Sequence, residues 1–149
     1  MIKKLLPLCS LAIGISFVTS SCSSSKSNNL PSQEQYEGYK IIDSVDRDTV
    51  NVKIDKEEKI AVVFRDISTT AYSFLEPRYN NSMVRFDAKS NCCNSDPQMM
   101  GNSGKIVYKF SFIGKGDTTI NLVARHKGLS PTTKSFDDDR VYTINVHVD

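Results

Sequence analysis

From about residue 38 onward, apolar and polar residues alternate with a period of two along most of the chain. Successive side chains of a β-strand point to opposite faces of a sheet, so this period is typical of strands that bury one face. The alternation is clearest at residues 50–54, 60–64, 106–112 and 142–148. No stretch of ten or more residues shows the helical spacing, so we expect an all-β domain.

Turn-forming residues divide the chain into short segments. Pro77, Pro97 and Pro131 fall between the alternating stretches, where a missing N–H does not interrupt a ladder of hydrogen bonds. Residues 114–117, Gly-Lys-Gly-Asp, suit a tight hairpin. Four further strands are expected at residues 39–45, 72–75, 84–86 and 120–124. Strands of this length and spacing predict an immunoglobulin-like antiparallel β-sandwich of about 7–8 strands, with long loops at 88–104 and 126–139.

The first residues show the order of parts found in an export signal. Lys3 and Lys4 precede an apolar stretch at 5–18, and small residues then lead to Cys22. This order predicts a bacterial lipoprotein signal peptide at 1–21, whose removal leaves Cys22 to carry membrane-anchoring acyl chains. A plain secretory signal with an incidental cysteine and an uncleaved anchor remain the alternatives.

Composition changes after the signal. Residues 22–37 are polar and rich in Ser and Asn, which predicts a flexible tether, and residues 38–149 have the length of one domain. Without Lys3 and Lys4 the formal net charge of +2 falls to zero, so the domain lacks the basic surface of a nucleic-acid-binding protein. We expect a monomeric domain in the cell envelope, anchored to a membrane through its N-terminal lipid, on either the periplasmic or the surface face.

Few residue combinations in the domain suit catalysis or a cofactor. Cys92 and Cys93 are adjacent, which fits neither a long-range disulfide nor a zinc site. Loop thiols or a local disulfide are favoured over a redox switch. His147 lies next to the C-terminus, and His126 lies in a predicted loop with no nucleophile motif beside it. We therefore expect no enzymatic activity and no cofactor.

An acidic run occupies residues 137–139, which are three consecutive aspartates. Consecutive carboxylates lack the alternating spacing of a calcium-binding loop. The interpretation favoured for this run is a solvated face of a loop.

The segment after residues 60–64 is the most specific candidate for a functional site. Thr69 and Thr70 precede two aromatic residues, Tyr72 and Phe74, that are separated by a single position. Small polar residues favour turns in general. The order found here also resembles the Asn-Pro-Thr-Thr-Gly-aromatic-x-Trp signature of the chagasin family of cysteine protease inhibitors. Both threonines and both aromatic positions match that signature.

Other positions in the same segment differ from the family pattern. Ile67, Ser68 and Ala71 stand where the family has Asn, Pro and Gly. Proline fixes one backbone angle and glycine permits a positive φ. The substitutions therefore predict a loop of different shape or rigidity.

Two later segments resemble the other family loops in the expected order. The Gly-x-Gly-Gly motif before a long strand corresponds to Gly101, Asn102, Ser103 and Gly104, which keep the outer two glycines. The Arg-Pro-Trp motif corresponds to Arg125, His126 and Lys127, which keep the arginine only.

The resemblance extends from about residue 49 to 148. It implies a reversible inhibitor of papain-like cysteine proteases that blocks the active site with three loops at one end of the sandwich. The binding residues that it implies are Ser68, Thr69, Thr70, Ala71, Gly101, Asn102, Ser103, Gly104, Arg125, His126 and Lys127. The alternative is a non-inhibitory immunoglobulin-like binding module on the envelope. The positions that differ from the family motifs, Ile67, Ser68, Ala71, His126 and Lys127, are the reason to consider it.

Overall fold

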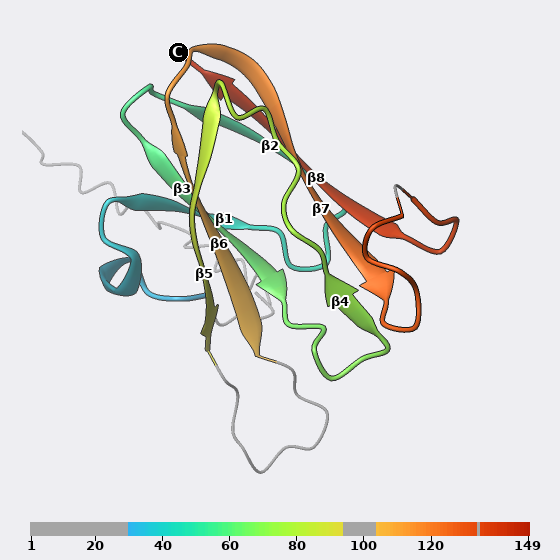
Figure 1. Ribbon diagram of the computed structural model, residues 1–149. Coiled ribbons are helices and arrows are strands. Elements are labelled where there is room, and N and C mark those ends of the chain that lie inside the picture. Colours follow the sequence, from blue (N-terminus) through green and yellow to red (C-terminus); the bar gives the residue numbers. More distant parts are fainter. Residues whose placement is uncertain (1–29, 94–103, 134) are drawn as a thin grey trace, which may run out of the picture.

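The computed structural model describes residues 30–93, 104–133 and 135–149. Eight strands form two four-stranded sheets packed face to face, which confirms the predicted all-β sandwich (Figure 1). Sheet 1 consists, from edge to edge, of β1 (Tyr39–Asp43), β3 (Lys59–Arg65), β6 (Lys105–Phe112) and β5 (Val84–Cys92). Sheet 2 consists of β2 (Thr49–Ile54), β8 (Arg140–Val148), β7 (Gly116–His126) and β4 (Tyr72–Phe74).

Strand direction departs from the prediction at one edge of each sheet. Four of the strand pairs are antiparallel, but β1 pairs with β3 and β2 pairs with β8 in parallel. The chain leaves β1 at one edge of sheet 1 and enters β2 at one edge of sheet 2, so consecutive strands lie in different sheets. Alternation of apolar residues specifies which face a strand buries and does not specify its direction. The parallel pairs were therefore not predictable from the pattern.

The main core lies between the two sheets and is built from the predicted alternating positions. On β6 the inward stripe is Ile106, Tyr108, Phe110 and Phe112, all of them buried. Its counterparts on the other strands are Val50, Val52, Ile54, Ile60, Val62, Phe64, Val84, Ile120, Leu122, Ile144, Val146 and Val148. The interior is thus continuous from one end of the sandwich to the other.

Strand β5 is longer than the sequence predicts. The prediction ended it at residue 86 and began a long loop at 88, whereas the strand continues to Cys92. A bulge between Phe86 and Ala88 shifts its register against β6 and breaks the alternation. The residues beyond the bulge lie on an edge strand and are mostly polar, which hides the strand from a pattern of period two.

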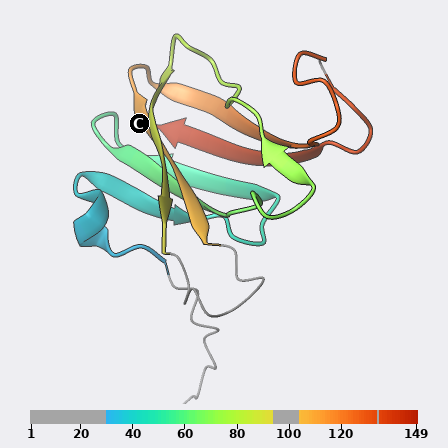
Figure 2. The same ribbon diagram turned by 60° about the horizontal axis from the view of Figure 1, so that its bottom comes forward.

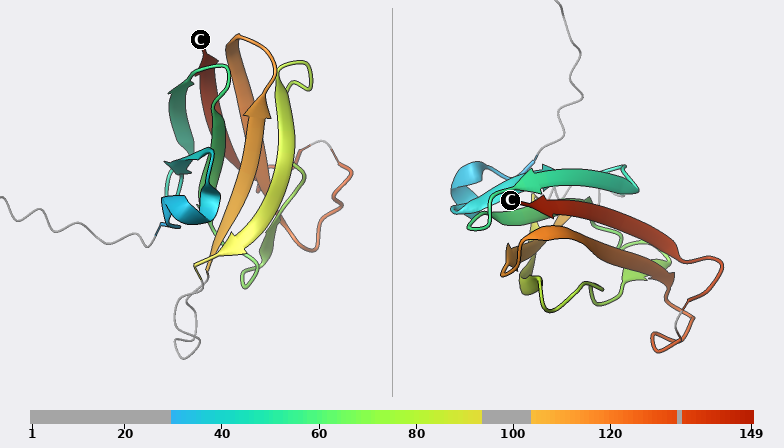
Figure 3. Two further views of the ribbon diagram at one scale, coloured as in Figure 1. Left: turned by 90° about the vertical axis from the view of Figure 1, so that its left-hand side faces the viewer. Right: turned by 90° about the horizontal axis from the view of Figure 1, so that it is seen from above.

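The folded domain begins earlier than predicted. Residues 30–37 were assigned to the tether, but Pro31 is buried and Gln33–Tyr36 form a 3-10 turn, η1, beside β1 (Figure 3). Tyr36 is buried against Ala61, Val63 and Val107 on the outer face of sheet 1. This packing explains why β3 is buried on both faces. A single tyrosine in a polar segment gave no periodic signal.

The predicted signal peptide, Cys22 and the rest of the tether lie outside the described residues. No helix in the part of the chain that is described has both the length and the apolar character needed to cross a bilayer.

Replacing Tyr36 tests whether the N-terminal segment belongs to the fold. Tyr36→Ala removes a buried ring that also lies 4.7 Å from the Lys109 ammonium. We expect the free energy of unfolding, measured by urea denaturation, to fall by about 3 kcal/mol. The exposed Gln35 of the same turn offers a matched control, because Gln35→Ala should leave the midpoint unchanged. Equal stability of the two variants would place the domain boundary after residue 37.

Candidate functional site

The candidate site lies at the end of the sandwich where β3 and β7 finish and β4 and β8 begin (Figure 1). Residues 66–71, here called the threonine loop, connect β3 in sheet 1 to β4 in sheet 2. The connection between β7 and β8, residues 127–139, projects from the same end (Figure 2). Two of the three segments grouped by the sequence resemblance are therefore neighbours in space.

The threonine loop is closed by its own hydrogen bonds. The Ser68 amide donates to Oδ1 of Asp66 at 2.8 Å. Both the amide and the hydroxyl of Thr70 donate to the Ile67 carbonyl, at 2.9 and 2.7 Å. The Thr70 hydroxyl oxygen also accepts the amide of Tyr72 at 3.1 Å. Side chains of Asp and Thr thus form the turn where the chagasin signature has proline and glycine.

The two threonines have different roles in this geometry. The Thr70 hydroxyl is used inside the loop, whereas Thr69 is exposed at the tip and its hydroxyl makes no hydrogen bond within the described residues. Ala71 does not have the positive φ that glycine favours. The glycine-to-alanine difference consequently costs no backbone strain here.

Lys127 joins the threonine loop to the end of β7. Its ammonium donates to the carbonyls of Ser68 and Thr70, both at 2.7 Å, and its amide donates to the Ala71 carbonyl at 2.8 Å. The pairing of β4 with β7 continues this contact, since Tyr72 lies opposite His126 in the register. Three bonds from one residue hold the loop against sheet 2, at the position where the family motif has tryptophan.

Aromatic and cationic groups flank the loop on the sheet 2 side. The Tyr72 and His126 rings meet edge to face at 5.7 Å, and the Arg140 guanidinium lies 4.6 Å from the Tyr72 ring centre. His126 is the last residue of β7 and is exposed, rather than lying within a loop as predicted. Both His126 and Lys127 are available on the surface.

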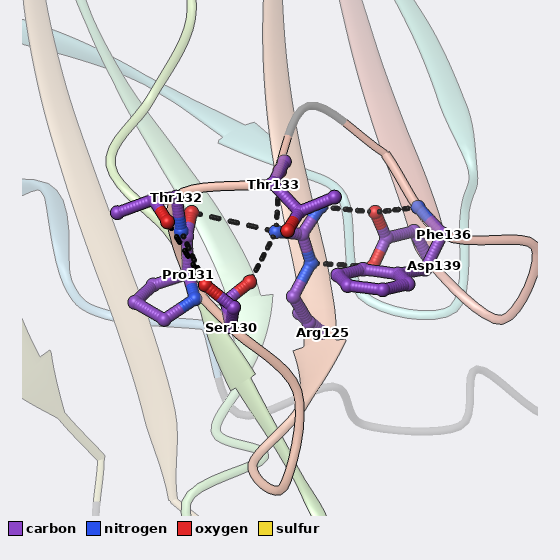
Figure 4. Close-up of polar contacts among 7 residues, drawn as sticks. All are labelled: Arg125, Ser130, Pro131, Thr132, Thr133, Phe136 and Asp139. Carbon is purple, nitrogen blue, oxygen red and sulfur yellow. Dashed lines mark hydrogen bonds and ion pairs between the residues drawn. The ribbon is translucent and has the colours of Figure 1, made fainter.

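Arg125 occupies a different position from the one predicted. Its side chain is 1% exposed and lies beneath residues 130–139 (Figure 4). Nε and Nη2 donate to the two carboxylate oxygens of Asp139 at 2.8 and 2.5 Å. Nη1 donates to the carbonyls of Ser130 and Thr133 at 2.9 and 2.7 Å. Arg125 therefore supports the β7–β8 connection from inside and presents no surface to a partner, which corrects its assignment as a direct contact.

The ion pair between Arg125 and Asp139 corrects the interpretation of the acidic run at residues 137–139. Asp137 and Asp138 are exposed, as predicted for a solvated loop, but the Asp139 side chain is 5% exposed and bound to Arg125. The Phe136 ring packs 4.7 Å from the Arg125 guanidinium. In the described part of the chain, no three His, Cys, Asp or Glu side chains gather in a way that suits a metal ion.

The second predicted loop is represented by one residue. The Gly104 carbonyl accepts the Asp66 amide at 2.9 Å, so the end of that loop contacts the start of the threonine loop. Gly101, Asn102 and Ser103 lie outside the described residues.

Cys92 and Cys93 are free thiols, with Sγ atoms 2.8 Å apart at the end of β5. Burial is the main reason that the pKa of Cys92 rises to about 12. A thiol with so high a pKa stays protonated at neutral pH and is a poor nucleophile.

A groove lies beside the threonine loop, and sequence reasoning did not anticipate it. Its volume is about 410 Å³. Its lining comes from four strands, β3, β4, β7 and β8, together with the threonine loop and the connection between β1 and β2. The lining residues are Ser44, Asp46, Asp48, Phe64, Arg65, Ile67, Thr70, Ala71, Tyr72, Phe74, Ala124, Arg140 and Tyr142. The aromatic residues in this set occupy ordinary strand positions, so the sequence carries no signal that distinguishes them from core residues.

Comparison with solved structures identifies the fold. The cysteine protease inhibitor EhICP2 from Entamoeba histolytica matches 73% of this chain and 95% of its own, with a TM-score of 0.53 and 17% identity. The domain has a chagasin-like fold. Weaker matches to this chagasin-like domain are amebosin, with a TM-score of 0.41 and 19% identity, and PbICP-C in complex with falcipain-2, with a TM-score of 0.44 and 11% identity. They cover 74% of this chain and 99% and 88% of their own chains. No family model and no curated protein matches the sequence.

The buried ion pair predicts a specific loss of stability in acid. Hydrogen bonds from Arg125 are the main reason that the pKa of Asp139 is lowered from 3.8 to about 2. A carboxyl group with a lowered pKa in the folded state contributes stability above its unfolded pKa and loses it as the pH falls through the folded value. We expect the free energy of unfolding to decline from about pH 4 to about pH 2, and the decline to be shallower in Asp139→Asn. Urea denaturation at a series of pH values measures both curves.

Asp138→Asn is the control for this prediction, since it removes the same charge from an exposed neighbour in the same connection. It should retain the wild-type slope. A wild-type slope in Asp139→Asn as well would show that the ion pair is not the source of the acid sensitivity.

Proposed function

We propose that this protein is a non-enzymatic, reversible inhibitor of papain-like cysteine proteases, and that its threonine loop enters the active-site cleft. The observation that carries the proposal is the hydrogen-bonded threonine loop, held by Lys127 at the loop end of a chagasin-like fold. EhICP2, whose fold is similar, is described as a cysteine protease inhibitor.

The geometry of the loop suits inhibition rather than cleavage. Its turn is closed by bonds from Asp66 and Thr70, so its residues are not extended as a substrate strand would be. A loop already held in one shape loses little conformational entropy on binding. The exposed Thr69 at the tip offers a hydroxyl to the polar groups of a cleft. Occlusion without acyl transfer makes the inhibition reversible.

Neighbouring residues complete the proposed contact surface. His126 and Lys127 flank the threonine loop on the sheet 2 side, and the Gly104 carbonyl meets the start of the loop beside sheet 1. Arg125 acts as a positioning residue, because its bonds fix the connection that begins at Lys127. Three segments would then grip the two walls and the floor of a cleft.

We further propose that the inhibitor is held in the cell envelope by acyl chains on Cys22. The support is the order of basic, apolar and small residues before that cysteine. Residues 23–30 would then link the membrane to the packed segment that begins at Pro31.

Titration of papain and a cathepsin-like protease with the protein tests the inhibitory function. We expect stoichiometric loss of activity that recovers on dilution. Thr69→Ala should raise the inhibition constant roughly fivefold, the effect of losing one hydrogen bond of about 1 kcal/mol. The melting temperature should not change, because the Thr69 hydroxyl has no bond within the described domain.

Variants of Thr70 test whether inhibition depends on the shape of the threonine loop. Thr70→Val removes the hydroxyl that closes the turn and should weaken inhibition, whereas Thr70→Ser keeps that hydroxyl and should restore it. Asn81→Ala, at the opposite end of the sandwich, is the control. A folded protein that inhibits none of these enzymes at micromolar concentration would favour the envelope binding module instead.

A further inference from the structure

The groove beside the threonine loop has an aromatic floor that remains partly exposed. Phe64, Phe74 and Tyr142 contact one another, with each pair of ring centres 5.7 Å apart. Phe64 is buried, but Phe74 and Tyr142 are only half buried although they pack against the main core. Partly exposed aromatic rings in a concave site are typical of a surface that binds an apolar group.

The two arginines that line the groove differ in whether a carboxylate pairs with them. Arg65 is neutralised by Asp46, whose two carboxylate oxygens accept its Nη2 at 2.7 and 2.9 Å. Arg140 lies over the Tyr72 ring and has no carboxylate partner in the described part of the chain. Asp48 precedes β2, and its carbonyl accepts the amide of Thr143, further along β8 than Arg140. The cation available to a ligand is therefore Arg140, on the side of the threonine loop.

The threonine loop itself forms one wall of the groove, through Ile67, Thr70 and Ala71. A surface onto which this loop docks must consequently also lie against the groove. The volume of about 410 Å³ is in the range of sites that hold small ligands, about 300–1,000 Å³, and admits a whole side chain with its flanking backbone. The chain contains no tryptophan to insert into a partner.

We propose that the groove receives an apolar side chain from the bound protease, and that a carboxylate beside that side chain pairs with Arg140. This proposal rests on the proposed inhibitory function and names the feature of the target that sets specificity. The anchoring side chain belongs to the protease, and the inhibitor supplies the aromatic hollow. A guanidinium already stacked on Tyr72 loses little further freedom when a carboxylate binds it.

Photocross-linking with the full chain tests whether the protease enters the groove. p-Benzoylphenylalanine is placed at position 142 on the floor and, in a second variant, at position 67 on the wall. We expect each to cross-link to an inhibited protease on irradiation. The same residue at position 79, which is half buried beside Phe110 and does not line the groove, should give no product.

Inhibition constants test the charge. Arg140→Gln should raise the inhibition constant roughly tenfold or more, because a charge-assisted hydrogen bond is lost. Arg47→Gln makes the same change of net charge at an exposed residue that does not line the groove, and should have no effect. A target without a carboxylate near its cleft should not distinguish the two variants.

The outcomes separate this proposal from the function on which it rests. If the unmodified chain inhibits no cysteine protease, both are overturned. If it inhibits and position 67 in the threonine loop cross-links, but position 142 does not and Arg140→Gln matches Arg47→Gln, the groove assignment alone is overturned.

Discussion

A buried guanidinium must find an acceptor for nearly every N–H that it carries, and at Arg125 this requirement organises the loop end of the sandwich. The nearby acceptors are the Asp139 carboxylate and the carbonyls of Ser130, Pro131 and Thr133, all from the connection that follows β7. Without Asp139 the guanidinium charge would be unpaired in the interior, and without the carbonyls a buried N–H would lack an acceptor. The connection is thereby drawn onto the sheet although few of its residues are apolar.

This constraint extends to the threonine loop through the next residues of the chain. Lys127 leaves β7 directly after His126 and binds three carbonyls of the threonine loop. Within that loop, Asp66 and Thr70 hold the turn with their side chains. Hydrogen bonds from these side chains thus close the turn at the positions where the chagasin signature has proline and glycine.

The sheets were largely predictable because the alternation that marks a strand is contained within a few consecutive residues. Alternating residues such as those of β3 and β6 specify which side chains face the core, and the structure places them there. Three features escaped prediction for identifiable reasons. The bulge in β5 breaks the alternation, Tyr36 is a lone aromatic in a polar segment, and the direction of β1 and β2 has no counterpart in a period of two.

Within the site, the sequence determined which segments to compare: a Thr-Thr turn before two aromatic residues, and an arginine near the end of a later strand. It also determined that the domain is all-β, because a period of two repeats in nearly every segment. Tertiary structure alone decided that Arg125 is buried while Lys127 and Thr69 are exposed, and that Phe64, Phe74 and Tyr142 border a groove. The reason is physical: burial and pairing depend on which strands meet across the two sheets, and residues far apart in the chain settle that together.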